Sequence, residues 1–357
     1  MKVVAGLSGG VDSAVAAARL RDAGHDVLAV HLALAAPPGG ASGEAGDAAQ
    51  VAQALGLPFE IWDLRQEFQR EVVDPFVAEY AAGRTPNPCL RCNETIKFAA
   101  LLDRATGRGF DAVGSGHYAR LVPATTGAGA PVVQLHRGVD PTKDQAYVLA
   151  VLDQGALARC VFPLGESTKA DVRDEAARRG LPVAAKGDSL DVCFIDDGDT
   201  RGFLAARTQA RPGPILDVDG QVVGEHAGAL GFTVGQRKGL ALRRPAPDGQ
   251  PRYVVQVRPA DGVVVVGPPD ALQVSHLSGS RVRWPSGVVA DVGTRVGIQV
   301  RAHGREIPGR FVAVPGGGQD TLGVSLDRPV RGVACGQTMV AYDGTRVVAS
   351  AVIDATR

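Results

Sequence analysis

The amino-acid sequence predicts a doubly wound α/β domain with a parallel sheet, followed by a small central domain and a C-terminal β-barrel. Through residues 1–200, short apolar runs alternate with Ala-rich helical patterns, which is typical of strands joined by crossover helices. Beyond residue 200, β-branched runs bounded by turn residues replace the helical patterns, among them Tyr253–Val257, Gly262–Val266 and Val296–Val300. A chain of 357 residues, 45% of them hydrophobic, is long enough for two or three domains. We place these domains at residues 1–200, 201–269 and 270–357.

The elements of the first domain follow from its apolar pattern. The expected strands are Lys2–Leu7, Val27–Leu34, Phe59–Leu64 and Asp111–Ser115, and the expected helices are Ser13–Ala23, Glu44–Leu55, Gln66–Ala82 and Glu94–Thr106. Ligands of a parallel sheet bind at the carboxyl ends of its strands. The loops after Leu7, Leu32 and Ser115 are therefore the expected binding site.

The two parts of the chain differ in charge although the whole chain is balanced, with 38 basic and 38 acidic residues. Residues 1–200 hold 19 basic and 26 acidic side chains, whereas residues 201–357 hold 19 basic and 12 acidic ones. A basic excess confined to one part indicates a surface that binds a polyanion.

The sequence also predicts the cellular compartment. No apolar stretch approaches the roughly 18 residues of a membrane span, and the N-terminus runs directly into an expected strand instead of a signal peptide. Five cysteines are too few for a disulfide scaffold of this length, so reduced and reactive thiols are expected. Both observations favour a cytoplasmic protein.

The sharpest motif is Ser8-Gly9-Gly10-Val11-Asp12-Ser13, between the first expected strand and the first expected helix. Glycines let the backbone turn tightly and bring its N–H groups against a phosphate, and the helix N-terminus adds its positive dipole. The motif lacks the lysine of a Walker loop and the third glycine of a dinucleotide fingerprint. It predicts a phosphate-binding loop of another kind.

Two cysteine-bearing segments form the second constellation. Residues 83–93, Gly-Arg-Thr-Pro-Asn-Pro-Cys-Leu-Arg-Cys-Asn, predict a Pro-stiffened loop before a helix that starts near Asn93. Cys92 would then precede a helix N-terminus, where the dipole and neighbouring Arg91 favour its thiolate. Residues 188–195, Asp-Ser-Leu-Asp-Val-Cys-Phe-Ile, place Cys193 in a strand-like setting.

These motifs resemble a known enzyme family. The hexapeptide is similar to the pyrophosphate-binding loop of the ATP pyrophosphatases that include GMP synthetase, argininosuccinate synthetase and tRNA thiolases. The cysteine segments resemble those of the tRNA-specific 2-thiouridylases within that superfamily, and the likeness covers nearly the whole chain. Further matches, in the family's order, are Ser115-Gly116-His117-Tyr118, Lys143-Asp144-Gln145, Phe162-Pro163-Leu164-Gly165, Gly235-Gln236-Arg237-Lys238-Gly239-Leu240 and Cys335-Gly336-Gln337.

The resemblance implies a reaction and its participants. ATP, accompanied by Mg²⁺, would adenylate the C2 oxygen of the wobble uridine in a tRNA anticodon, and a sulfur donor protein would deliver a persulfide to Cys193. The persulfide sulfur would replace AMP at C2, and Cys92 would act as a nucleophile that leaves a Cys92–Cys193 disulfide for reduction. Both steps are chemically sensible, because adenylation creates a leaving group and a persulfide is a strong nucleophile.

The resemblance also assigns binding residues. ATP would contact Gly6, Leu7, Ser8, Gly9, Gly10, Val11, Asp12, Ser13, Leu32 and Gly116, and tRNA would contact Asn87, Pro88, Cys89, His117, Lys143, Asp144, Gln145, Arg301 and Gln337. Two positions depart from the family pattern. Cys89 stands where the better-known loop has an Asp proposed for acid–base work, and Ala302 stands where an aromatic residue is usual.

Three alternatives remain open from the residues. Cys89, Cys92 and Cys193 are enough thiolates to hold a [4Fe–4S] cluster with one open iron, which would carry the sulfur instead of a persulfide. An amidotransferase-type ATP pyrophosphatase that acts on a small molecule would explain the phosphate loop but not the cysteines. A non-catalytic RNA-binding module would explain the basic excess alone.

Overall fold

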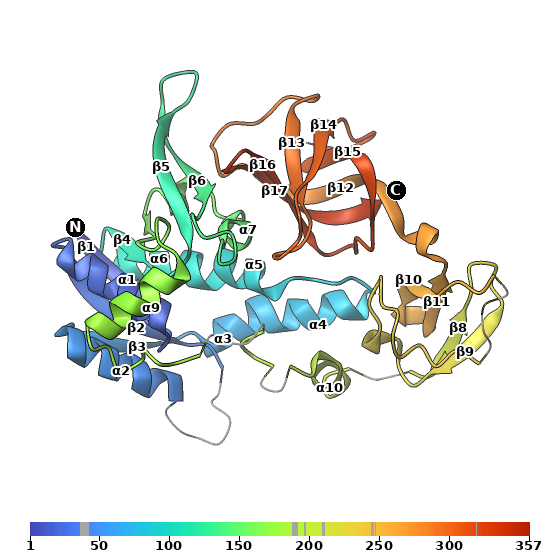
Figure 1. Cartoon of the computed structure of the whole chain (residues 1–357), viewed down its shortest axis with the longest axis horizontal. Helices are drawn as coiled ribbons and strands as arrows, with labels where there is room; N and C mark the ends of the chain where they lie inside the picture. Colours follow the sequence, from blue (N-terminus) through green and yellow to red (C-terminus); the bar gives the residue numbers. More distant parts are fainter. Residues whose placement is uncertain are drawn as a thin grey trace.

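A computed structural model of the chain describes residues 1–35, 43–187, 192–195, 198–208, 211–243, 246, 248–318 and 320–357. The motif at residues 188–195 therefore lies partly outside the described residues. The parallel sheet, the barrel and a small central sheet occupy different regions of the molecule in Figure 1, and each has a hydrophobic core. The predicted fold class is confirmed.

The first domain contains a five-stranded parallel sheet in the order β3-β2-β1-β4-β7. Its strands are β1 (Lys2–Gly6), β2 (Asp26–Ala33), β3 (Phe59–Asp63), β4 (Ala112–Gly114) and β7 (Cys160–Val161). Helices α1 (Val11–Asp22), α2 (Gly43–Leu55) and α9 (Lys169–Arg178) pack on one face, and α6 (Leu101–Gly107) packs on the other. The strand order reverses between β1 and β4, and a reversal of this kind is where doubly wound folds bind ligands.

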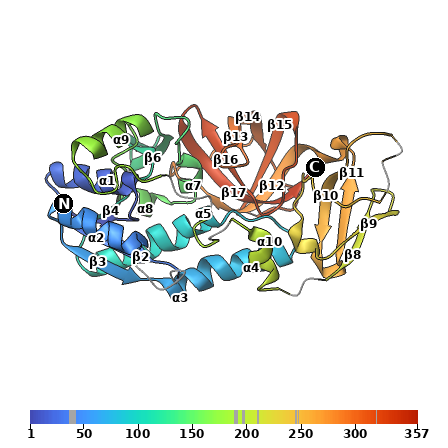
Figure 2. The same cartoon turned by 60° about the horizontal axis from the view of Figure 1, so that its bottom comes forward.

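Two long helical segments extend from this domain towards the rest of the molecule. The first comprises α3 (Arg65–Phe68), η2 (Gln69–Val73) and α4 (Asp74–Ala81), and the second comprises α5 (Pro88–Cys92), η3 (Asn93–Ala100) and α6. Both views place α4 between the parallel sheet and the central sheet (Figure 1, Figure 2). The second helix begins at Pro88, so the predicted start near Asn93 is wrong.

The reason for the earlier start is local. Asn87 is the N-cap of α5, and its Oδ1 accepts a hydrogen bond of 3.0 Å from the N–H of Cys89. Pro88 occupies the first helical position, where its missing N–H costs nothing. Cys92 is consequently the last residue of α5 and does not precede a helix N-terminus.

The remaining chain is mainly β-structure. The central sheet has the order β10-β11-β8-β9, from β8 (Gly213–Leu216), β9 (Val222–His226), β10 (Tyr253–Arg258) and β11 (Val263–Gly267). Six further strands, β12 (Gln273–Arg283), β13 (Arg295–Gln299), β14 (Ile307–Val312), β15 (Thr321–Arg331), β16 (Thr338–Asp343) and β17 (Arg346–Thr356), follow. They are ordered β12-β15-β14-β13-β16-β17, and pairing of β12 with β17 closes them into a barrel.

The barrel is docked firmly on the first domain. The hairpin β5 (Ala119–Thr125) and β6 (Pro131–Arg137) continues the barrel sheet beyond β17. Short helices α7 (Ala146–Leu149) and α8 (Gln154–Leu157) join a core shared with β16 and β17. A third short helix, α10 (Thr200–Ala205), packs on α4. The first domain and the barrel thus share one sheet and one core.

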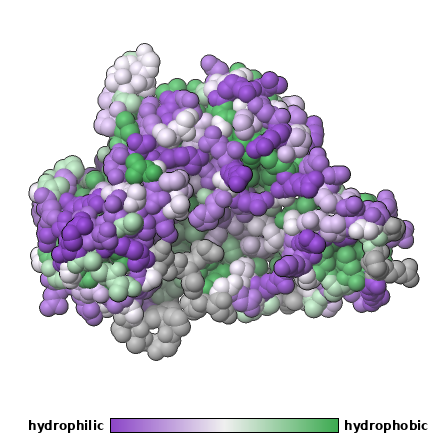
Figure 3. Space-filling view, in the orientation of Figure 1, coloured by the Kyte–Doolittle hydropathy of each residue, from purple (hydrophilic) through white to green (hydrophobic). Residues whose placement is uncertain are grey.

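Hydrophilic residues predominate on the face shown in Figure 3, and apolar residues form separate small areas there. Among the described residues, no helix is long and apolar enough to cross a membrane.

Candidate active site

The predicted phosphate loop joins β1 to α1 and has the geometry that its glycines imply. Gly9 has a φ of +75°, and an added Cβ would lie 2.5 Å from the carbonyl oxygen of Glu44, so a side chain is excluded there. Gly10 is the extended N-cap of α1. The hydroxyls of Ser8 and Ser13 lie 3.1 Å apart and tie the two ends of the loop together. Gly6, Leu7, Val11 and Asp12 complete this segment, with Leu7 and Val11 buried beneath it.

The loop after β4 meets the phosphate loop, as predicted from the sheet. An added Cβ on Gly116 would lie 2.7 Å from the carbonyl carbon of Asp12 and 2.8 Å from the N–H nitrogen of Ser13. The backbone at Gly116 therefore packs directly on the first turn of α1, where only glycine fits. The Tyr118 hydroxyl donates a hydrogen bond of 2.7 Å to Asp12 Oδ1.

Two lysines that the sequence analysis did not assign also lie at the phosphate loop. Lys169 Nζ lies 2.8 Å from both carboxylate oxygens of Asp12. Lys186 Nζ donates to the Gly9 carbonyl at 3.0 Å and to Asp47 Oδ2 at 2.6 Å. The chain has six lysines against 32 arginines. This scarcity of lysine is the sequence signal that could have drawn attention to Lys169 and Lys186.

Cys92 is buried in the core between η2 and η3, with only 5% of its surface exposed, among Phe68, Val72 and Ile96. Burial raises the pKa of the Cys92 thiol to about 12, and the positive charge of Lys97 only partly opposes this. Arg91, which was expected to favour the thiolate, instead forms ion pairs with Glu71 and Glu94. The prediction of a Cys92 thiolate is therefore wrong for the ligand-free protein.

Cys193 is exposed and lies in a turn, because the N–H of Ile195 donates to the carbonyl of Val192 at 3.1 Å. The predicted strand-like setting is wrong. The neighbouring side chain of Phe194 anchors the turn by edge contacts with Phe68, Phe76 and Phe203. Desolvation by the surrounding chain raises the pKa of the Cys193 thiol, and Lys97 opposes this.

The two predicted catalytic thiols are brought to the same region. Phe194 and Cys92 belong to one hydrophobic cluster, and interaction with the Cys193 thiol contributes to the raised pKa of Cys92. Leu32, at the end of β2, packs against this cluster, so the cluster adjoins the loop region of the sheet. Glu44, whose carbonyl faces Gly9, also raises the pKa of Cys193. Cys193 is thus linked by a charge interaction to Glu44, which contacts the phosphate loop at Gly9.

Cys92, Cys160, Cys193 and Cys335 are free thiols. Cys89 is half-buried in the first turn of α5, and Cys160 is buried in the core. In the part of the chain that the structure describes, no group of three or more His, Cys, Asp or Glu side chains is arranged to hold a metal ion. The three thiols proposed for a cluster do not form a ready ligand set there.

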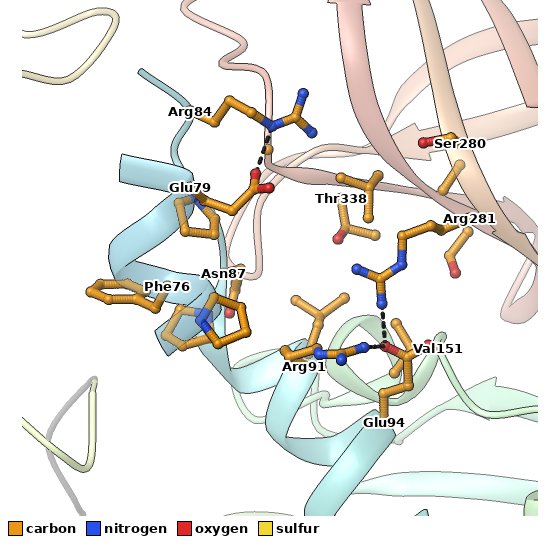
Figure 4. Close-up of a pocket in the computed structure, with 18 of the residues that line it drawn as sticks. Phe76, Glu79, Arg84, Asn87, Arg91, Glu94, Val151, Ser280, Arg281 and Thr338 are labelled. Atoms are coloured by element: carbon orange, nitrogen blue, oxygen red, sulfur yellow. Dashed lines mark hydrogen bonds and ion pairs between the residues drawn. The ribbon is translucent and has the colours of Figure 1, made fainter. Parts of the chain in front are cut away.

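A cavity of about 460 Å³ lies between α4, α5 and the barrel, and Asn87 and Pro88 form part of its wall. In Figure 4, Arg91 and Arg281 both point at the carboxylate of Glu94, which accepts hydrogen bonds from Arg91 at 3.2 Å, Arg281 at 2.7 Å and Arg283 at 2.9 Å. One carboxylate therefore holds three guanidinium groups, and this wall of the cavity keeps a positive excess.

The other predicted tRNA contacts are less uniformly accessible. His117 lies between the rings of Phe98 and Phe162, and burial with nearby Lys97 lowers its pKa to about 3. Asp144, with 8% of its side chain exposed, accepts from Arg137 at 2.8 Å. Lys143 and Gln145 flank Asp144 and are half-buried, and Gln145 Oε1 accepts from the N–H of Tyr118. These geometries give Asp144 a structural role, and contact of this segment with tRNA stays a prediction.

Arg301 and Gln337 line a second cavity of about 360 Å³, between the central sheet and the barrel. Gln337 Nε2 donates to the Thr85 carbonyl at 2.6 Å, and Arg301 donates to the Gly332 carbonyl at 2.9 Å. Both side chains thus stand where the cysteine-bearing loop meets the barrel.

Comparison with known proteins covers the whole chain. Residues 1–197 match the family described as tRNA methyl transferase HUP domain, residues 201–268 the tRNA methyl transferase PRC-barrel domain, and residues 274–353 the aminomethyltransferase beta-barrel domain. The tRNA-specific 2-thiouridylase MnmA of Beutenbergia cavernae is 54% identical over 367 residues, covering 100% of this chain and 95% of the relative. The proteins of the same name from Micrococcus luteus and a Nocardioides species are 53% and 54% identical, covering 100% of this chain and 97% and 98% of their own lengths.

Solved structures are more distant. A 4-thiouridine synthetase in complex with RNA and ATP aligns with a TM-score of 0.36 at 19% identity, covering 54% of this chain and 44% of that one, and this likeness is too weak to bear on function. The family descriptions name a methyl transfer, whereas the full-length relatives are named for thiolation. Because those relatives match from end to end at more than half identity, they decide the assignment: the chain belongs to the tRNA-specific 2-thiouridylase family.

Proposed function

We propose that the protein catalyses ATP-dependent 2-thiolation of the wobble uridine in tRNA anticodons. The observation that carries the proposal is that Phe194, the neighbour of the exposed thiol Cys193, packs in one cluster with the buried thiol Cys92, in a domain whose glycine-rich loop leads into a helix N-terminus. The full-length relatives are named tRNA-specific 2-thiouridylases, which supports tRNA as the substrate and 2-thiouridine as the product. An exposed thiol suits loading by another protein, and a buried one suits a later intramolecular step.

The proposed chemistry has three steps. The C2 oxygen of uridine attacks the α-phosphate of ATP, which releases pyrophosphate and makes AMP the leaving group. The terminal sulfur of a Cys193 persulfide then bonds to C2 and displaces AMP. Finally, Cys92 gives up its proton and attacks Cys193 Sγ, which breaks the S–S bond, frees 2-thiouridine and leaves a disulfide between the two cysteines. A cellular thiol supplies the two electrons that reduce this disulfide.

The proposal assigns a partner or cofactor to each part of the site. ATP binds at residues 6–13, Leu32 and Gly116, and Mg²⁺ enters with its phosphates. The anticodon loop approaches Asn87, Pro88 and Cys89, where a single-stranded base is cheaply unstacked. A cysteine desulfurase or sulfur relay protein docks at exposed Cys193. Because tRNA and these donor proteins are the proposed partners, the proposed location of the activity is the cytoplasm.

The test is nucleoside mass spectrometry of unmodified tRNA after incubation with the protein, ATP with Mg²⁺, and a cysteine desulfurase with cysteine, which supplies the persulfide sulfur. We expect 2-thiouridine and one AMP for each thiolated base. Cys193→Ser should abolish thiolation and retain tRNA binding. Cys335→Ser is the matched control, because a hydroxyl can replace the thiol that donates to the Asp354 carbonyl at 3.1 Å. Thiolation at the normal rate by Cys193→Ser would refute the persulfide role.

The same experiment separates the other functions. AMP release with a small amide acceptor and without tRNA would support an amidotransferase, and tRNA binding without AMP release would support a binding module. An iron assay on protein purified without oxygen tests the cluster alternative. Stoichiometric iron in the wild-type protein that is lost in Cys89→Ser would contradict the persulfide mechanism. It would support a cluster held by Cys89, Cys92 and Cys193.

A further inference from the structure

The phosphate loop has two lysines at its edges that the hexapeptide does not contain. Lys169 reaches Asp12 from the start of α9, and Lys186 reaches Gly9 from the segment that follows α9. In each case the ammonium group bonds to a carboxylate as well: Asp12 for Lys169 and Asp47 for Lys186. Two ammonium groups and two carboxylates therefore lie at the edges of the glycine-rich loop, which is the expected anion site.

The backbone holds Lys169 in this position. Lys169 is the first residue of α9, and Thr168 is the N-cap. Thr168 and Asp171 form a capping box, in which the side chain of each accepts a hydrogen bond from the backbone N–H of the other. The N–H of Lys169 donates to Asp140 Oδ2 at 2.9 Å, and 13% of its side chain is exposed. A lysine charge that is this far withdrawn from water needs a fixed partner, and in this structure Asp12 provides it.

The carboxylates are poor neighbours for a phosphate. Asp12 lies in the first turn of α1, where the helix dipole attracts any anion, so its charge competes with a triphosphate for the same amides. An ammonium group has three donors on a flexible stem and bonds equally well to a carboxylate or to a phosphate oxygen. Exchange of one anion for the other requires only a change of side-chain rotamer.

The side from which the lysines approach identifies the end of the nucleotide that they meet. Both come from the face of the sheet that carries α1, α2 and α9. Leu32 and Cys92 belong to clusters on the opposite face. In the proposed reaction the α-phosphate reacts with a uridine that the thiols must also reach, so the α-phosphate would lie towards that face. The lysines therefore face the part of the triphosphate that leaves.

We propose that Lys169 and Lys186 bind the β- and γ-phosphates of ATP, exchanging the Asp12 and Asp47 carboxylates for phosphate oxygens when the nucleotide enters. This assignment rests on the proposed use of ATP. Two cations at this end of the nucleotide stabilise the charge that develops on pyrophosphate as its bond to the α-phosphate breaks. They are thus positioned to favour departure of pyrophosphate as well as binding.

The test is titration calorimetry of the full chain with ATP, pyrophosphate and AMP, each with Mg²⁺. Lys169→Met and Lys186→Met keep the length of the apolar stem and remove the charge. We expect each variant to bind ATP and pyrophosphate about 10- to 100-fold more weakly, as loss of a charge-assisted hydrogen bond implies. The Kd for AMP should change less than about twofold. Lys238→Met, on an exposed loop of the central domain, is the matched control.

The comparison of ATP with AMP distinguishes the loss of a phosphate contact from a general disturbance of the fold, which would weaken binding of both nucleotides. Lys186 and Asp47 are both more than one-third exposed, so Lys186→Met should fold even if Lys169→Met is destabilised, and Lys169→Arg should keep ATP binding near that of the wild type. Equal losses of affinity for AMP and ATP, or unchanged ATP affinity in both Met variants, would overturn the assignment of the two lysines. Either result would leave the proposed function standing. Failure of the wild-type chain to bind ATP would overturn the proposed function and this assignment with it.

Discussion

The two thiols should differ greatly in their reactivity towards iodoacetamide, because only a thiolate reacts. Burial raises the pKa of Cys92 to about 12. At about pH 8, roughly one Cys92 thiol in 10,000 is then ionised, against about a quarter of free cysteines with a pKa of about 8.5. Ionisation alone therefore slows alkylation of Cys92 by about a thousandfold, and steric exclusion at 5% exposure slows it further. Exposed Cys193 should react much faster.

The assay is a time course of alkylation, read for each cysteine by peptide mass spectrometry. Lys97→Met provides the perturbation, because Lys97 is the cation that lowers the pKa of both Cys92 and Cys193. We expect Cys193 to react several-fold more slowly in this variant. Cys335 is an internal control, since its nearby cation is Arg84 and not Lys97. Its rate should not change.

Two results would refute this reasoning. Alkylation of Cys92 at the rate of a free cysteine would mean that the thiol is not enclosed among Phe68, Val72 and Ile96. If the ratio of the Cys193 and Cys335 alkylation rates is the same in Lys97→Met as in the wild type, Lys97 does not lower the pKa of Cys193.

Three further variants test other parts of the site. Asp12→Ala removes the shared acceptor that holds Lys169 and Tyr118 at the loop, and their loss of position should outweigh the removal of a competing charge. AMP release, measured by chromatography, should fall by about 10- to 100-fold with unchanged tRNA affinity. Arg281→Ala with Arg283→Ala should weaken tRNA binding in filter assays and reduce the slope of log affinity against log salt by about two. The pKa of His117 lies at about 3, so the unfolded chain takes up its proton first on acidification. Wild-type stability to urea should therefore fall by up to about 2 kcal/mol relative to His117→Gln between about pH 7.5 and pH 5.

The phosphate loop was predictable because its information is local. A strand, two glycines and a helix follow one another within residues 2–22, so the loop geometry depends on few distant contacts. The requirement for glycine at residue 116 was not local, since it arises from the packing of the β4 loop on Asp12 and Ser13. Sheet topology nevertheless anticipated that meeting, because adjacent parallel strands deliver their loops to one edge.

The environment of Cys92 was not predictable in the same way. The pair Asn87-Pro88 is a helix start signal, and reading it as such would have placed Cys92 inside the helix. The pKa of the thiol depends on residues far apart in sequence. Glu71 and Glu94 neutralise the arginine that was expected to act on Cys92, and Phe68 from a different helix covers the sulfur.

The two charged parts of the chain attract their ligands over different ranges. At the phosphate loop, Lys169 and Lys186 are each balanced by a carboxylate, so the loop has little field at a distance and relies on short-range exchange of partners. On the barrel wall, Arg281 and Arg283 share Glu94 with Arg91, and an uncompensated positive charge remains.

Exposed charge attracts an RNA backbone from a distance and releases counterions, whereas balanced pairs do neither. A rise from about 50 to 200 mM salt should therefore weaken tRNA binding by about tenfold or more while ATP binding changes little. Equal salt dependence of the two affinities, measured on the same preparation, would contradict this division between the two halves of the site.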